Sequence, residues 1–156
     1  MLNYHFGTRE GLLEAVVNEL ANRRLAADVE LFPLDGRDGL RARWEQLTAP
    51  ERSHDTDRLF FELAAIALRR PEATERFRAD YAEPWLEISA RSVENTPIDA
   101  EQARIVTRLD IAVLRGLLLD LLVTGDNAEI EEAFEVYARL RRAAIDVAVE
   151  SMAVGD

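Results

Sequence analysis

Apolar side chains recur along this chain at steps of three and four residues, the spacing that places them on one face of an α-helix. The pattern starts at Thr8, a good N-cap residue, and predicts a first helix over residues 8–31. A turn rich in glycine and aspartate follows at 32–39, and the next helix ends before Pro50. The apolar face of this second helix consists of Leu40, Trp44 and Leu47.

Two further helices are predicted in the middle of the chain. The third begins near Asp55 or Asp57 and continues to Arg70, and apolar residues cover most of its circumference, so we expect it to be largely buried. The fourth begins with Pro71 and carries an aromatic-rich stripe. Pro84 lies inside this fourth segment and lacks a backbone N–H, which predicts a kink at that point.

The last two predicted helices are the longest. Asp99 can cap the start of the fifth helix, which is the most apolar segment and extends to about Val123. Gly125 suits a C-terminal stop, and Asp126 can then cap the sixth helix. No alternating pattern is long enough for a β-strand, so the sequence predicts an all-α bundle of about six helices.

Length and composition fit one compact domain. The chain has 156 residues, and 48% of them are hydrophobic, which is too apolar for a disordered chain. It contains no cysteine and two histidines, His5 and His54, so we expect no disulfide, no metal site and no cofactor. The longest apolar run, 111–123, is too short for a membrane span, and no secretion leader is evident, so we expect a cytoplasmic location.

Charge and residue pattern argue against two classes of function. The net charge of −11 leaves no basic patch for phosphates, which weighs against nucleic-acid binding by these residues alone. The sequence lacks a nucleophile–base pair, a glycine-rich phosphate loop and metal-ligand spacing, so we do not predict an enzyme. His54 lies in the acidic segment 51–57 and fits a surface residue at a helix start better than a general base.

The segment 4–16, YHFGTREGLLEAV, resembles a junction found in TetR-family transcriptional regulators. In that family, such a motif closes the recognition helix of a helix-turn-helix and starts the long connecting helix. A looser similarity extends to 117–126, which resembles the end of the penultimate helix in these proteins. The residues that match the junction are Tyr4, His5, Phe6, Gly7, Thr8, Arg9, Glu10 and Leu12.

This resemblance implies that residues 1–7 are a remnant of the DNA-binding helix-turn-helix and that residues 8–156 form an effector-binding and dimerisation domain. The family carries a complete helix-turn-helix before the motif, so we expect a truncated chain, with a natural short form as the alternative. In an intact parent, the resemblance implies DNA phosphate contacts by Tyr4, His5 and Arg9. The alternative is that the aromatic residues of the motif only pack between two helices and have no contact with DNA.

In this family the middle helices enclose an effector pocket, and this chain carries aromatic residues on them. Aromatic walls with a few polar groups suit a small apolar ligand, although each residue could instead belong to the core. Asp110 lies near the edge of an apolar face, where it could bind a cationic ligand or pair with an arginine of a neighbouring helix, and Glu62 poses the same choice. The predicted effector-binding residues are Trp44, Phe60, Phe61, Tyr81, Trp85, Asp110 and Leu114.

The last two helices of TetR-like proteins form a four-helix bundle with a second subunit, which predicts a homodimer. Much of that apolar face could instead be core within one chain. Arg104, Arg108 and Arg115 fall along one side of the fifth helix, and we expect them to face solvent or to form interface salt bridges. The predicted dimer-interface residues are Leu117, Leu118, Leu121, Tyr137, Leu140, Arg141 and Ala144.

Together these features predict a TetR-type regulator, most often a repressor in that family. Effector binding would shift the helix at 8–31 and modulate DNA binding by the missing domain. One alternative is a DNA-free dimeric module that binds a ligand or sequesters full-length partners, and another is a structural dimer with a filled interior. A helix-turn-helix encoded in frame upstream would favour the regulator, and its absence would favour the module.

Overall fold

The fold is all-α, as the sequence predicts. In the part of the chain that the structure describes, every regular element is a helix and no strand is present. The helices are α3 (Asp38–Thr48), α4 (Asp55–Arg69), α6 (Glu83–Ser92), α7 (Ala100–Thr124) and α8 (Asn127–Ala153). The structure is a computed structural model that describes residues 8–9, 11–12, 15–16, 19, 38–50, 53–69, 77, 82–92 and 99–153.

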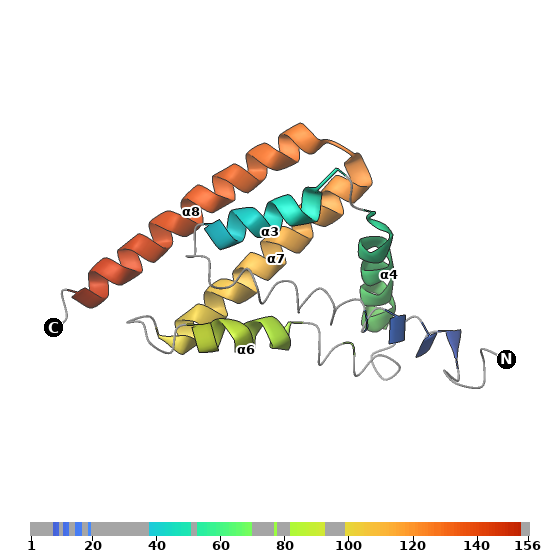
Figure 1. The fold of residues 1–156 in the computed structure, drawn as a ribbon, viewed down its shortest axis with the longest axis horizontal. Helices are drawn as coiled ribbons and strands as arrows, with labels where there is room; N and C mark the ends of the chain where they lie inside the picture. Colours follow the sequence, from blue (N-terminus) through green and yellow to red (C-terminus); the bar gives the residue numbers. More distant parts are fainter. Residues whose placement is uncertain are drawn as a thin grey trace.

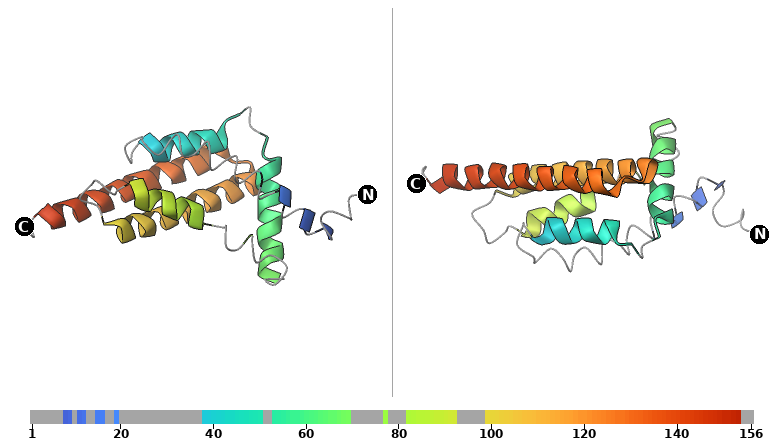
Figure 2. Two further views of the ribbon diagram at one scale, coloured as in Figure 1. Left: turned by 60° about the horizontal axis from the view of Figure 1, so that its bottom comes forward. Right: turned by 90° about the horizontal axis from the view of Figure 1, so that it is seen from above.

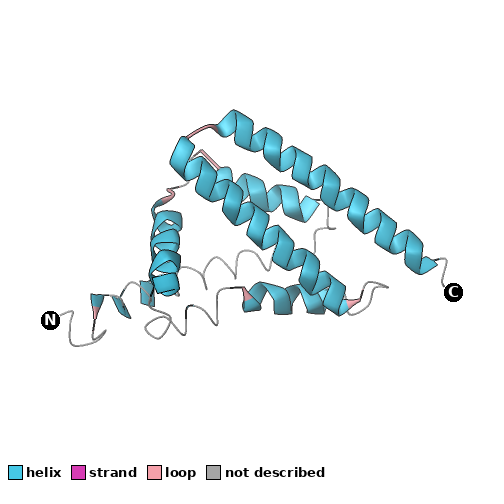
Figure 3. Ribbon diagram, turned by 180° about the vertical axis from the view of Figure 1, so that it is seen from behind, coloured by secondary structure: helices cyan, strands magenta, loops and turns pink. Residues whose placement is uncertain are grey.

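The central helix of the bundle is α7, which packs against α3, α6 and α8. With α8 it forms a hairpin whose arms diverge from the turn at Gly125 (Figure 1). Seen from above, α7 and α8 lie in one layer and α3 and α6 in a second, while α4 stands across one end (Figure 2). The opposite view shows α7 and α8 without another described helix in front of them (Figure 3).

The core of this bundle lies near the α7–α8 turn. Residues of α3, α7 and α8 pack there into one cluster, which we call the junction core. A smaller cluster joins α6 to Ile111 of α7, and another joins α4 to Phe77. The buried members of the junction core are Leu40, Trp44, Leu47, Leu114, Leu118, Leu121, Ile130 and Phe134.

The predicted start and end of α7 and the predicted start of α8 are confirmed in detail. Asp99 accepts a hydrogen bond from the backbone N–H of Gln102 at 3.1 Å, which satisfies one donor of the first turn of α7. Gly125 has a φ of 73°, a left-handed conformation that glycine adopts without steric cost, and its N–H donates to the carbonyl of Leu121. Asp126 caps α8 in turn, because its carboxylate accepts from the N–H of Glu129 at 3.0 Å.

The start of the predicted first helix is also present. The backbone N–H of Gly11 donates to the hydroxyl of Thr8 at 3.0 Å, and the N–H of Leu12 donates to the Thr8 carbonyl. Arg9 lies in the first turn and is exposed. The remainder of that helix, from residue 20 to residue 31, lies outside the described residues, as does the remnant at 1–7.

Two expectations for the middle helices are wrong. The kink at Pro84 does not occur, because α6 begins at Glu83 and the proline lies in its first turn. A first turn has no intrahelical acceptor for its N–H groups, so proline costs no hydrogen bond there. The burial of α4 is also overestimated, since one face alone is covered and Leu68 is 88% exposed. The buried residues of α4 are Asp57, Leu63 and Ala67.

Among the described residues, no helix combines the length and the apolar character that crossing a membrane requires.

Candidate functional site

The junction core is joined to α8 by an aromatic stack. The rings of Trp44 on α3 and Phe134 on α8 lie 5.0 Å apart between centroids and are inclined by 8°. The guanidinium of Arg41 lies 4.5 Å from the centroid of the Phe134 ring, within the range of a cation–π contact. This stack fixes the position of the indole of Trp44 relative to the first turns of α8.

Polar contacts continue this connection between α3 and α8. The indole Nε1–H of Trp44 donates to Oε2 of Glu131 at 2.6 Å, and Arg41 donates to Oε1 of the same carboxylate at 2.5 Å. Arg41 also pairs with Glu135, one helical turn further along α8. Burial raises the pKa of Glu131, but the hydrogen bonds from Arg41 and Trp44 and the charge of Arg41 outweigh burial, so the pKa is lower than its ordinary value.

A cleft of about 550 Å³ opens beside this network, where the ends of α3, α4, α7 and α8 meet. Its apolar wall includes the indole of Trp44, the ring of Pro50 and the side chains of Leu121 and Ile130. Its polar groups include Glu131 and Asn127 of α8, Thr48 of α3, and His54, which directly precedes α4. This volume lies within the range typical of small-molecule sites, roughly 300–1,000 Å³.

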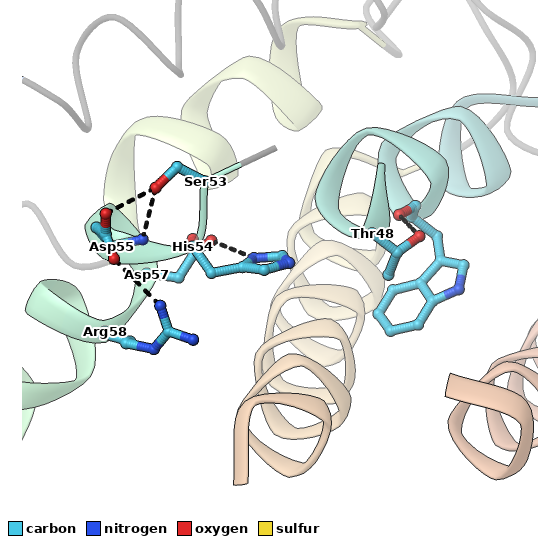
Figure 4. Close-up of polar contacts among 7 residues, drawn as sticks. Thr48, Ser53, His54, Asp55, Asp57 and Arg58 are labelled. Carbon is cyan, nitrogen blue, oxygen red and sulfur yellow. Dashed lines mark hydrogen bonds and ion pairs between the residues drawn. The ribbon is translucent and has the colours of Figure 1, made fainter. Parts of the chain in front are cut away.

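The imidazole of His54 reaches this cleft from the start of α4. Its Nδ1 lies 3.1 Å from Oδ2 of Asp57, a carboxylate that is 1% exposed. Figure 4 shows the ring extending from this contact toward α7 and toward the side of the molecule that carries Thr48. Ser53 and Arg58 both donate hydrogen bonds to the carboxylate of Asp55, and these contacts hold the first turn of α4 in place (Figure 4).

Sequence reasoning placed His54 at a helix start, and its carbonyl does accept the N–H of Arg58 in the first turn of α4. It missed the role of the side chain, which lines the cleft and pairs with Asp57. The spacing of three residues between His54 and Asp57 was the available signal, because residues i and i+3 lie on the same side of a helix. The cleft that His54 lines is formed with residues of α3, α7 and α8, and the spacing of His54 and Asp57 in the sequence does not reveal this packing.

The predicted effector residues do not form one group. Trp44 and Leu114 are buried in the junction core, and Phe61 packs against it. The ring of Phe60 lies 5.5 Å from that of Phe61, while Trp85 is buried on α6 in a separate cluster. Tyr81 lies outside the described residues.

Arg115 of α7 connects two of these aromatic residues. Its guanidinium lies 4.7 Å from the ring centroid of Phe60 and 5.6 Å from that of Trp85. The sequence predicts that Arg104, Arg108 and Arg115 face solvent or form interface salt bridges, and of the three Arg108 is exposed. Arg104 is half-buried and pairs with Glu83 at 2.6 Å. The contacts of Arg115 with α4 and α6 depend on the packing of these helices, for which the sequence carries no local signal.

Asp110 belongs to a polar contact between α7 and α8. It accepts hydrogen bonds from the hydroxyl of Tyr137 at 2.6 Å and from Nε of Arg141 at 2.7 Å. The alternative of an interhelical ion pair is therefore confirmed for Asp110, whereas Glu62 is exposed. Burial raises the pKa of Tyr137 above its ordinary value of 10.0, and the hydrogen bond to Asp110 and its negative charge raise it further.

The predicted dimer residues divide between the interior and the surface. Leu118 and Leu121 are buried in the junction core of their own chain, and Leu117 packs against them. Tyr137 and Arg141 contribute to the Asp110 contact. The residues of this set that lie exposed on α8 are Leu140 and Ala144.

A different apolar stripe is exposed on α7. Its residues alternate in steps of four and three, which is the heptad spacing of helices that pack along one another. Ile105 is 63% exposed, Leu109 54% and Val123 76%, and a Cβ added at Gly116 would meet no atom within 4 Å. We call this surface the outer stripe of α7, and it consists of Ile105, Leu109, Ala112, Gly116, Leu119 and Val123.

A matching stripe is exposed on α8. Val136 is 46% exposed and Leu140 65%, and small residues lie on either side of them along the helix. We call this surface the outer stripe of α8, and it consists of Ala133, Val136, Leu140 and Ala144. In each stripe the exposed apolar side chains follow one another at helical spacing instead of occurring singly.

Comparison with known proteins adds no relative to this description. A scan against protein-family models, a search of curated proteins and a search of solved structures each gave no match. No group of three or more potential metal ligands occurs among the described residues.

Proposed function

We propose that this chain is the effector-binding and dimerisation part of a TetR-type transcriptional regulator. The observation that carries the proposal is the outer stripe of α7 together with the outer stripe of α8. These stripes lie on the two long C-terminal helices, the pair that a regulator of this type uses for its second subunit. The cap at Thr8 also fits, because the junction motif at 4–16 starts a helix at that residue.

The exposed stripes support a dimer for an energetic reason. Burial of apolar surface contributes roughly 25 cal/mol per Å², so a long heptad stripe in water is a source of association energy. In a two-fold dimer, the outer stripes of both chains would form one four-helix contact. Gly116 lies at the centre of the α7 stripe, where the absence of a side chain lets a partner helix approach.

The regulatory step follows from the connection between the helices. A small apolar effector would bind where Phe60, Trp85 and the guanidinium of Arg115 lie between α4, α6 and α7. Such an effector can shift the bundle only by binding one arrangement of these helices more tightly than another. Movement of α4 or α6 relative to α7 would then change the spacing of two DNA-reading heads in the dimer.

A second candidate function is a DNA-free dimeric module. The net charge of −11 favours it, because an acidic surface repels DNA phosphates. Both candidates require the same dimer, and they differ in whether a DNA-binding helix-turn-helix is encoded in frame upstream of Met1.

Sedimentation equilibrium tests the proposal. We expect a species of twice the chain mass of 17.6 kDa. Leu109→Glu places a charge in the outer stripe of α7 and should shift the population to monomer, because an unpaired charge is costly to bury.

Leu68→Glu is the matched control, since Leu68 is an exposed leucine on α4, away from both stripes. It should leave the dimer intact. A wild-type chain that stays monomeric at high concentration, or a folded Leu109→Glu variant that remains dimeric, would contradict the proposal.

A further inference from the structure

We propose that the cleft at the junction of α3, α4, α7 and α8 binds a small planar cation that carries paired N–H donors, such as an aryl amidinium group. This inference rests on the cleft alone and stands whether or not the chain is a regulator. It also concerns a different place from the aromatic residues around Arg115.

The apolar wall of the cleft favours a flat ligand. The indole of Trp44 is held by its stack on Phe134, so its orientation is fixed before a ligand arrives. Pro50, Leu121 and Ile130 add apolar surface from three further parts of the chain. Trp44 is 1% exposed, so the indole gives the wall rigidity, and the exposed ring of Pro50 is the flat apolar surface that a ligand ring can pack against with little loss of side-chain entropy.

The first acceptor for such a ligand is the imidazole of His54. In the neutral imidazole with its proton on Nδ1, that N–H donates a hydrogen bond to Asp57, and the opposite ring nitrogen, Nε2, carries the lone pair and is a hydrogen-bond acceptor. The buried position of Asp57 holds the imidazole in this orientation, and Figure 4 shows the ring directed away from that contact toward α7. In this neutral tautomer, His54 offers an oriented acceptor to a donor in the cleft.

The second acceptor is the carboxylate of Glu131. Trp44 and Arg41 each use one of its oxygens, and a carboxylate oxygen has a second lone pair for a further donor. Two carboxylates, those of Glu131 and Glu135, share the one guanidinium of Arg41 in this network. The network therefore retains negative charge, which favours a cation over a neutral donor or an anion.

Benzamidine is the probe that tests this assignment. The chain has two tryptophans and two histidines, so its indole N–H and imidazole signals in NMR spectra are few and can be assigned by substitution. We expect the Trp44 indole and His54 ring signals to shift in a saturable way, with a Kd of about 1 mM, while the Trp85 indole changes little. Benzamide and benzoate have the same ring without the positive charge and should bind at least about tenfold more weakly.

Two variants test the two acceptors separately. Glu131→Gln keeps an oxygen for Trp44 but removes the charge, and His54→Gln removes the imidazole acceptor held by Asp57. Each should weaken benzamidine binding by about tenfold, whereas Glu62→Gln, an exposed change on α4, should leave binding unchanged.

The assignment is overturned if folded protein shows no shift of the Trp44 signal with benzamidine at tens of millimolar. It is also overturned if benzoate binds as well as benzamidine, or if Glu131→Gln binds benzamidine as tightly as the wild type does. A monomeric chain that binds benzamidine would contradict the regulator proposal and leave this one standing.

Discussion

The two apolar faces of α7 differ in what covers them. Leu114, Leu118 and the neighbouring Leu121 face α3 and α8 and are buried in the junction core. On the other side, Leu109 and Val123 are as apolar as these residues but remain in solvent. The comparison shows that an apolar side chain on a helix is buried only where another segment packs against it. In this chain, other helices pack against one of the two faces of α7.

The heptad pattern of the outer stripe indicates what kind of cover fits the exposed face. Its residues step by four and three along the whole helix, as in helices that pack side by side. The inner face instead receives α3 and α8 at one end of α7 and α6 at the other, which bury it in two separate clusters. The two faces should therefore respond differently to the same substitution.

The largest expected effect comes from Leu118→Ala on the inner face. Leu118 is 4% exposed, so removing its side chain leaves a cavity and should lower the free energy of unfolding by about 2–5 kcal/mol. Leu109→Ala on the outer stripe should change the stability of the single chain by less than about 0.5 kcal/mol and act on the dimer instead. Urea unfolding at two well-separated protein concentrations measures both terms.

The loss of stability in Leu118→Ala should be the same at both protein concentrations. The loss in Leu109→Ala should appear at the higher concentration, where the dimer forms, because only dimer stability depends on concentration. Equal behaviour of the two variants would mean that the two faces of α7 do not differ as the structure indicates.

A smaller effect is expected from Tyr137→Phe, which removes the hydrogen bond from α8 to Asp110 of α7. The loss at neutral pH should be roughly 1–2 kcal/mol, because the acceptor is charged. The pKa of Tyr137 is raised on folding, so its contribution is fully present below pH 10 and is lost as the pH rises toward the folded pKa. The stability difference between wild type and Tyr137→Phe should therefore shrink above pH 10.

Urea unfolding of both proteins from pH 8 upward tests this pH dependence. The other two tyrosines titrate in both proteins, so the difference isolates Tyr137. A difference that is constant up to the highest pH would show that the hydroxyl of Tyr137 does not contribute through its protonated form.

The smallest expected effect concerns Gly116, at the centre of the outer stripe. Gly116→Ala should stabilise a single chain by roughly 0.5–1 kcal/mol, because alanine loses less backbone entropy in a helix and its Cβ would meet no atom of this chain. Thermal unfolding of Gly116→Ala in the monomeric Leu109→Glu background should show this gain. In the dimer the gain in stability should be smaller, because the added methyl group would displace the partner helix. An equal gain in the monomer and in the dimer would show that no partner helix lies close to Gly116.

Most helix boundaries could be predicted from local chemistry. Asp99, Gly125 and Asp126 act through bonds to groups at most four residues away, so their roles were visible in the sequence. Pro84 was assigned to a helix interior because the sequence does not show that α6 begins at Glu83, and the same proline is compatible with a kink or a first turn.

The candidate site was harder to predict. The aromatic residues were identified as a group, but Trp44 and Phe60 lie in different clusters, because each is positioned by whichever helix packs against it. The side chains of His54 and Arg115 were interpreted as surface groups, since charge and polarity usually indicate exposure. The contact of His54 with Asp57 is local, but the cleft beside it and the aromatic rings beside Arg115 depend on the packing of separate helices.

The sequence by itself determined that this chain is helical, where α7 begins and ends, where α8 begins, and which of their positions are apolar. These properties depend on backbone hydrogen bonds and side-chain spacing within a few residues. Only the tertiary structure decided that Leu118 is core while Leu109 is surface, and that four helix ends enclose a cleft around Trp44 and His54. Such outcomes depend on which distant segment excludes water from a given face, and no local pattern carries that information.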